Sequence, residues 1–321
     1  MNPSSDWSYG VEHEWGNVSR KIELPGGNSW NFDDNTCVST TGIANDPKGE
    51  LYEFGGEINT APTECPEGQV KILERLTELL NPVVNYRSNL YIHIRVPGLI
   101  DDLEWLKKFL RYVDKHAQEA FDLVEPIPLP SKNQPTEHYE WEMKRYNRRK
   151  KSHQHRLSDT QVQRMLSAKT PEEFYLQEAH KNAKGQPAWF QCPRAGVNIR
   201  QIFEHSETIE FRHFPGTLDP EELRDAIQWC HEFTVAALGT QKTPTEIFES
   251  RSWQFPTFPD YDYYAEQVYQ YTNFDKNKRG IVESRLEALR EVIDIDDLSV
   301  TAREVWEYLP KEESEAGVLP V

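Results

Sequence analysis

The feature that most constrains the fold is a set of four short segments in which apolar and charged residues alternate. The clearest is residues 90–96, where every second residue is apolar and Tyr91, His93 and Arg95 fall between them. Successive side chains of a strand point to opposite faces, so this pattern predicts a strand with one buried face. Residues 8–18, 51–60 and 208–214 are predicted to be strands of the same sheet, and residues 197–203 are predicted to form a hairpin with 208–214.

Helical patterns separate these strands. Pro66 opens a predicted helix of about 15 residues with apolar residues at helical spacing. Asp101 and Asp102 are predicted to cap a helix that runs to about Val124, and Asp219 to start one that ends near Leu238. Strands in pairs with helices between them, without sustained strand–helix alternation, indicate an α+β domain around an antiparallel sheet.

The domain organisation follows from composition along the chain. Residues 125–135 contain four prolines and are predicted to be irregular, whereas residues 136–185 are charged and helical. We therefore expect one main domain over 1–240, with a helical insertion at about 130–185. Residues 241–321, which include a tyrosine-rich stretch, are expected to form a helical extension packed on that domain.

The net charge of −17 disfavours nucleic acid as a partner, because such a field repels a phosphate backbone. No apolar run reaches the roughly 18 residues that span a bilayer, and the first residues lack the pattern of a secretory signal. The four cysteines are far apart and suit reduced thiols, which predicts a cytoplasmic protein without a membrane partner. The sequence leaves the oligomeric state open.

Two segments bring carboxylates to one face of a strand. Glu12 and Glu14 lie two residues apart, and like charges this close are unfavourable unless they are solvated or share a cation. Glu53 and Glu57 occupy the second predicted strand, where Gly55-Gly56 would allow a close approach to the backbone. A solvated strand face and an ordinary turn are the alternative interpretations of these two segments.

The other two strands add cationic groups. His93 is followed on its face by Arg95, and Glu210 shares a face with Arg212, which is an ordinary ion pair if the strand stands alone. If the four strands are neighbours, their glutamates would crowd one surface beside His93. Such a cluster requires divalent cations, and its oxygen ligands favour Mg²⁺ or Mn²⁺ over Zn²⁺. The cations available for phosphate oxygens near the last strands are Arg194, Arg200 and Arg212.

The order of these motifs resembles the putative amidoligase family, which is grouped with glutamine synthetase and glutamate–cysteine ligase. The resemblance runs from Gly-Val-Glu-x-Glu at residue 10, through Glu-Ile-Asn-Thr and a strand histidine, to Arg-x-x-x-Asn at 194–198. Its most specific part is Glu-Phe-Arg-His-Phe-Pro-Gly-Thr-Leu at 210–218, and it covers about residues 9–238. It implies a curved antiparallel sheet of the glutamine synthetase-like catalytic type, with helices on its outer face.

The resemblance also implies cofactors and roles. ATP and Mg²⁺, or Mn²⁺ in its place, would bind the domain over 1–240, together with small-molecule or peptide carboxylate and amine substrates. By this analogy the metal ligands are Glu12, Glu14, Glu53, Glu57, Glu210 and His93. The groups that contact ATP, the transferred phosphate or the carboxylate substrate are Arg194, Asn198, Arg200, Arg212 and His93.

One position departs from the family. The family strand often reads His-x-His, whereas Arg95 takes the second position here, and a guanidinium does not bind a metal. The implied reaction is ATP-dependent joining of a carboxylate to an amine through an acyl phosphate. A metal-dependent hydrolase of an amide or phosphate ester, and a non-catalytic binding protein on the same fold, are the alternatives.

A basic segment, residues 144–156, stands out in this acidic chain. It is either the solvated face of an inserted helix, a mobile flap over an acidic substrate, or a docking site for an acidic peptide or nucleic acid.

Overall fold

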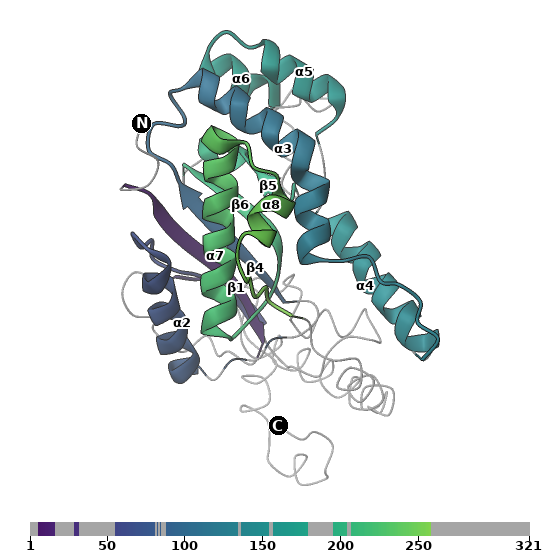
Figure 1. The fold of residues 1–321 in the computed structure, drawn as a ribbon. Helices are drawn as coiled ribbons and strands as arrows, with labels where there is room; N and C mark the ends of the chain where they lie inside the picture. Colours follow the sequence, from purple (N-terminus) through teal and green to yellow (C-terminus); the bar gives the residue numbers. More distant parts are fainter. Residues whose placement is uncertain are drawn as a thin grey trace, which may run out of the picture.

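The computed structural model of this chain describes residues 6–16, 29–31, 55–80, 82, 84, 88–133, 136–153, 157–178, 195–203 and 207–257. Within them, six strands form one sheet in the order β2-β3-β1-β4-β6-β5, and each neighbouring pair is antiparallel. Helices lie over the sheet in Figure 1, so the chain combines helices and an antiparallel sheet, as predicted.

Four strands coincide with the alternating segments. They are β1 (Ser8–Gly16), β3 (Gly55–Asn59), β4 (Asn89–Arg95) and β6 (Thr208–Pro215). The two edge strands are short, β2 (Ser29–Asn31) and β5 (Val197–Asn198). The four predicted strands are therefore neighbours in space, although up to about 200 residues separate them in sequence.

One prediction about the last hairpin is wrong. Residues 197–203 were expected to form a strand, but the strand ends at Asn198 and Arg200–Phe203 is a 3-10 helix. The side chain of Asn198 explains the break, because its Oδ1 accepts a hydrogen bond from the backbone N–H of Arg200 at 3.0 Å. This local bond turns the backbone out of the extended form that β-pairing needs.

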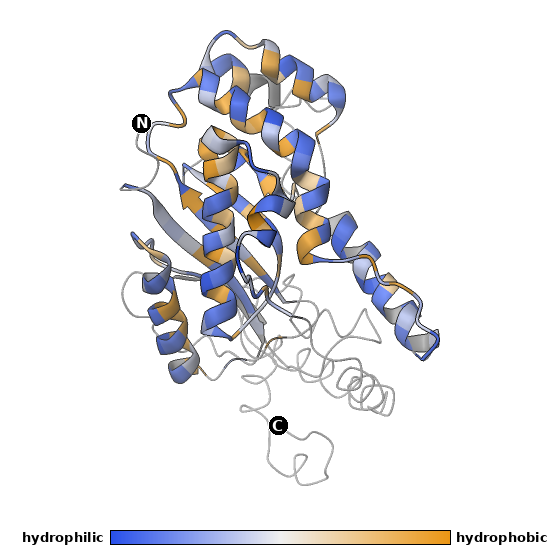
Figure 2. Cartoon of the chain, in the orientation of Figure 1, coloured by the Kyte–Doolittle hydropathy of each residue, from blue (hydrophilic) through white to orange (hydrophobic). Residues whose placement is uncertain are grey.

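Three helices pack on one side of the sheet: α2 (Pro66–Leu80), α3 (Leu103–Val124) and α7 (Pro220–Val235). Asp102 and Asp219 cap the last two through side-chain hydrogen bonds to backbone N–H groups, as the sequence predicts. In Figure 2 their hydrophobic residues gather on one stripe while their outer surfaces are hydrophilic. They bury Leu73, Phe109 and Trp229 against the strands.

The remaining helices are α4 (Thr136–His153), α5 (Asp159–Ser167), α6 (Pro171–Glu178) and α8 (Pro244–Glu249), and a π turn, Ala236–Thr240, ends α7. The first three fall in the predicted charged insertion. Val162, Met165 and Phe174 of α5 and α6 are buried in the same hydrophobic core as α3, whereas α4 extends away from the sheet in Figure 1. Most of the predicted C-terminal extension, with its tyrosine-rich stretch, lies outside the described residues.

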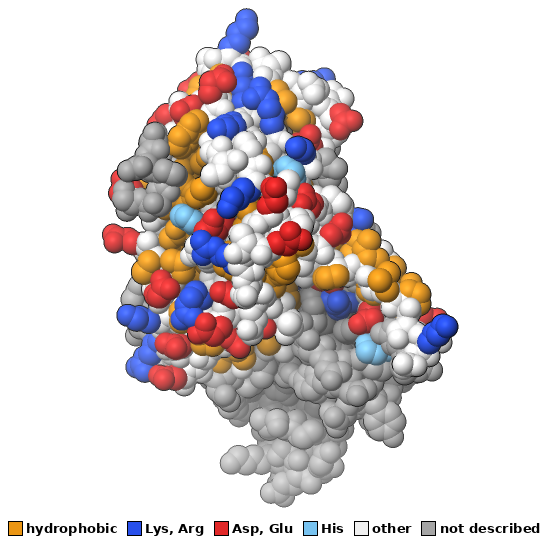
Figure 3. Space-filling view, viewed as in Figure 1, with side chains coloured by type: hydrophobic (Ala, Val, Ile, Leu, Met, Phe, Trp, Pro, Cys, Tyr) orange, Lys and Arg blue, Asp and Glu red, His pale blue; other side chains and the backbone are white. Residues whose placement is uncertain are grey.

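The strand register separates an apolar face from a polar face. Val11, Ile92 and Phe211 lie side by side and are buried under the helices. In the alternate positions, the polar face carries the charged residues of the same strands. Figure 3 shows the helical side, where acidic and basic side chains are interspersed. None of the helices in the described part of the chain is long and apolar enough to cross a bilayer.

Candidate functional site

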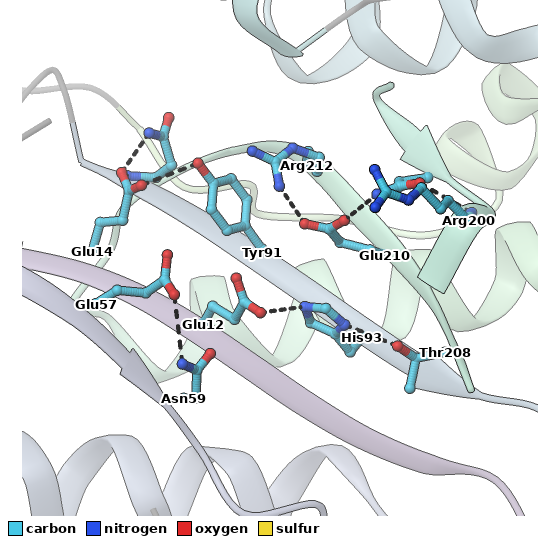
Figure 4. Close-up of polar contacts among 12 residues, drawn as sticks. Glu12, Glu14, Glu57, Asn59, Tyr91, His93, Arg200, Thr208, Glu210 and Arg212 are labelled. Atoms are coloured by element: carbon cyan, nitrogen blue, oxygen red, sulfur yellow. Dashed lines mark hydrogen bonds and ion pairs between the residues drawn. The ribbon is translucent and has the colours of Figure 1, made fainter. Parts of the chain in front are cut away.

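The polar face of the sheet brings distant carboxylates together. Glu14 is paired with Glu57 across β1 and β3, and His93 with Glu210 across β4 and β6. Glu12 lies between them on β1, two residues before Glu14. Figure 4 shows these side chains rising from four adjacent strands toward a common space. The alternation of each strand fixes which residues share this face, and the strand order makes them neighbours.

Three of these residues form the tightest group, which we call the His93 cluster: Glu12, His93 and Glu210. One ligand atom from each lies within 4.8 Å of the others. The Nε2 atom of His93 is 3.0 Å from Oε1 of Glu12, and its Nδ1 is 3.0 Å from the hydroxyl of Thr208. The contact with Thr208 fixes the ring orientation, so that Nε2 is directed at the two carboxylates.

In the His93 cluster and beside it, charged groups are buried close together and shift the pKa values of one another. Burial favours the neutral form of Glu12, but the hydrogen bond and charge of His93 outweigh it and lower the pKa of that carboxyl. Burial likewise opposes charging of His93, yet Glu12 and Glu210 raise its pKa. Burial and the charges of Glu12 and Glu14 raise the pKa of Glu57 to about 7. A positive charge close to these carboxyl groups therefore stabilises their ionised forms.

Arg212 supplies a fixed cation at this point of the sheet. Its guanidinium bonds to Glu210 and lies over the ring of Tyr91, 4.0 Å from the ring centroid. The other oxygen of Glu210 accepts a 2.6 Å hydrogen bond from Nδ2 of Asn198. Neighbouring carboxylates and the tyrosine raise the pKa of Arg212 although burial opposes this, so the guanidinium remains charged.

Glu14 belongs to a second group of connected residues, which we call the Arg149 network: Glu14, Asn89, Arg149 and Glu125. One oxygen of Glu14 accepts hydrogen bonds from the backbone and side-chain nitrogens of Asn89, at 3.1 and 2.5 Å. The other accepts one from the Tyr91 hydroxyl at 3.1 Å. Burial raises the pKa of Glu14, and these hydrogen bonds oppose that increase.

The structure places the remaining predicted site residues as follows. Asn198 and Glu210 are paired across β5 and β6, and Arg200 follows in the 3-10 helix next to them. Arg95 lies at the end of β4 and forms a half-exposed ion pair with Glu207, at 2.7 Å. Arg194 and Glu53 lie outside the described residues.

Sequence reasoning missed two residues that contact the predicted site, Asn89 and Tyr91 as hydrogen-bond donors to Glu14, and a third, Arg149, that contacts Asn89. The basic segment was interpreted as a solvated face or a flap, but Arg149 is buried and Arg145 is largely so, both paired with Glu125. Lys144 and Lys150 of the same helix are exposed. The available signal was the i, i+4 spacing of the two arginines, which places them on one face of α4.

Comparison with known proteins gives one match. Residues 111–234 match the model of a family described as a putative amidoligase enzyme. The matched segment contains Asn198, Glu210 and Arg212 but begins after the strands that carry Glu12 and His93. No curated protein and no solved structure matches the chain. The match over residues 111–234 confirms the resemblance to the putative amidoligase family that the motifs indicate.

Proposed function

We propose that this protein is an ATP- and Mg²⁺-dependent ligase that joins a carboxylate to an amine. The observation that carries the proposal is the convergence of Glu12, Glu57, Glu210 and His93 on one face of the sheet, beside Arg212. The family match supports formation of an amide bond. The sheet is then of the glutamine synthetase-like catalytic type, the substrates are small molecules or peptides, and the reaction is cytoplasmic.

The residues present fit a divalent cation. Glu12 and Glu210 offer carboxylate oxygens and His93 an imidazole nitrogen, close enough to bind one ion. Carboxylates favour hard cations such as Mg²⁺ and Mn²⁺, whereas the imidazole also suits softer transition metals. Glu57, Glu14 and Glu53 are proposed as further ligands. The ion would neutralise charge on phosphate oxygens.

The arginines and the amide are placed to bind anions next to this group. Arg212 can form paired hydrogen bonds with a phosphate or a carboxylate, because its guanidinium is planar. Contact with the face of Tyr91 holds that plane in one orientation. Arg200, Asn198 and Arg194 are proposed to extend the anion site toward the nucleotide, and His93 to lie at its base.

The proposed reaction has two steps. In the first, an oxygen of the substrate carboxylate attacks the γ-phosphorus of ATP, and the bond to the β-phosphate oxygen breaks, giving an acyl phosphate and ADP. In the second, the amine attacks the acyl carbon, phosphate leaves, and the amine loses a proton. The residues named above position the reactants and balance developing negative charge, and positioning with electrostatics accounts for most catalysis of phosphoryl transfer.

The decisive experiment is a screen of acid–amine pairs with ATP and Mg²⁺, in which phosphate release and product mass are both measured. A ligase forms ADP and a condensed product only when acid and amine are present together. Turnover of an amide or phosphate ester without ATP would show the metal-dependent hydrolase instead. Glu210→Gln is the matched inactive variant, and Glu207→Gln, whose side chain is half exposed beside Arg95, is the control.

A further inference from the structure

A buried network connects helix α4 to the polar face of the sheet. Arg149 has an exposed fraction of only 3% and makes three contacts through its guanidinium. Its Nη1 donates to Oδ1 of Asn89 at 2.6 Å, its Nη2 donates to the carbonyl of His213 at 2.7 Å, and its Nε is 3.2 Å from Glu125. The same Asn89 donates two hydrogen bonds to Glu14.

The orientation of Asn89 follows from the chemistry on its two sides. A guanidinium can only donate hydrogen bonds, so it requires the amide oxygen of Asn89. The Glu14 carboxylate accepts them, so it faces the amide nitrogen. With Arg149 in place, the amide has one favourable orientation, and that orientation directs its N–H group at Glu14.

The charged groups of the network point the same way. Arg145 and Arg149 both pair with the Glu125 carboxylate, at 2.8 and 3.2 Å. Arg149 also bonds to Asn89, whose side-chain amide donates to the buried carboxylate of Glu14. Buried charges need both partners and hydrogen bonds, and Asn89 supplies the connection.

We propose that Arg149 is a positioning residue of the site, which acts through Asn89 to hold the Glu14 carboxylate in place beside Glu57 and Glu12. Its consequence for metal binding rests on the ligase function proposed above. Arg149 does not touch the reactants in this scheme. Through Asn89 it fixes the position of Glu14 at one side of the carboxylate cluster, and so connects helix α4 to the site.

The test measures the dissociation constant of Mn²⁺ by calorimetry without nucleotide, together with the urea midpoint of unfolding. Arg149→Met is expected to weaken Mn²⁺ binding by about 10- to 100-fold, the range typical of groups that orient metal ligands. Arg149→Lys keeps the charge but not the three-way geometry, so it should recover part of the affinity.

Two variants on the same helix separate positioning from stability. Arg145→Met also loses an ion pair with Glu125, but leaves the contact between Arg149 and Asn89. It should lower the urea midpoint and keep Mn²⁺ affinity within about twofold. Lys144→Met, at an exposed position, should change neither quantity. Equal losses of affinity in Arg145→Met and Arg149→Met would overturn the proposal, because they would show a general loss of folding.

A double-mutant cycle between Arg149→Met and Asn89→Leu tests the route. The double variant should lose no more affinity than the weaker-binding single variant, because both break one connection. Losses that multiply would overturn the proposal. If wild-type protein does not bind Mn²⁺, the proposed function fails, and the cycle is read from urea midpoints with Arg149→Met and Glu14→Gln. Coupled shifts then support the positioning role, and additive shifts overturn it.

Discussion

The two halves of the polar face manage buried charge differently. In the Arg149 network, the carboxylates of Glu14 and Glu125 are met by protein donors, namely Asn89, Tyr91 and the arginines. In the His93 cluster, Glu12 and Glu210 converge on one imidazole and Arg212 also pairs with Glu210, while the carboxyl of Glu57, whose pKa is raised to about 7, adds negative charge as it ionises. One half is compensated from within the protein, whereas the other is the half that we propose to bind an added cation. A supporting network and the proposed reactive site thus lie side by side on the same strands.

The largest expected effect breaks the compensated half. Glu125→Gln removes the negative charge that pairs with Arg145 and Arg149, so both guanidinium groups lose this ion pair in the interior. Removing one partner of a buried ion pair destabilises a protein by about 3–5 kcal/mol. The free energy of unfolding in urea measures this directly. A loss below about 1 kcal/mol would show that water already screens these charges, and Glu104→Gln on exposed surface is the control.

The second effect concerns the half that gains from a cation. Glu12→Gln is expected to weaken Mn²⁺ binding by more than about 100-fold, or about 2.8 kcal/mol, because it removes a proposed ligand. The free energy of unfolding without metal should fall by less than in Glu125→Gln, because the lost ion pair with His93 is offset by relief of the repulsion between Glu12 and Glu57. A large loss of binding with a small loss of stability is the opposite of the result expected for Glu125→Gln. Unchanged affinity would remove Glu12 from the metal site.

A smaller effect links the compensated half to pH. Burial and the charge of Arg149 lower the pKa of His213 to about 3, against about 6.5 in an unfolded chain. Between these two pKa values the imidazole takes up a proton in the unfolded state but not in the folded state. The free energy of unfolding is therefore unaffected by His213 above about pH 6.5 and decreases as the pH falls below that value. From pH 7 to pH 5 the loss attributable to His213 is about 2 kcal/mol. Urea midpoints at both pH values should differ less in His213→Leu, and an equal difference would contradict the assignment.

The fold was predictable where one residue pattern determines one structure. The alternation in residues 90–96 determines both the strand and the face of each side chain, and Asp102 and Asp219 mark helix starts by their hydrogen bonds. The end of β5 was not predictable in the same way. It depends on one side-chain bond of Asn198, which competes with β-pairing in a segment whose composition suits a strand.

The residues of the candidate site differ in the same way, because strand periodicity predicts the positions of some of them and not of others. Glu12, Glu57 and Glu210 could be placed on one face because strand periodicity fixes their direction once the strands are neighbours. Arg149 could not, because the sequence does not specify which helix packs against the strand that carries Asn89. A basic segment in an acidic chain suggests a solvated surface, whereas in the structure two of its arginines point inward and pair with Glu125.

The smallest expected effect tests where the reactive half ends. Arg95 occupies the position where the resemblance predicts a second histidine, but its side chain is half exposed and paired with Glu207. Exposed pairs contribute about 0–1 kcal/mol, so Arg95→Ala should change the free energy of unfolding by less than that. Arg95→His restores the family pattern, yet Mn²⁺ affinity should stay within about twofold, because residue 95 faces Thr208 and not Glu210 across the strand pair. A tenfold gain would instead extend the metal site to the end of β4.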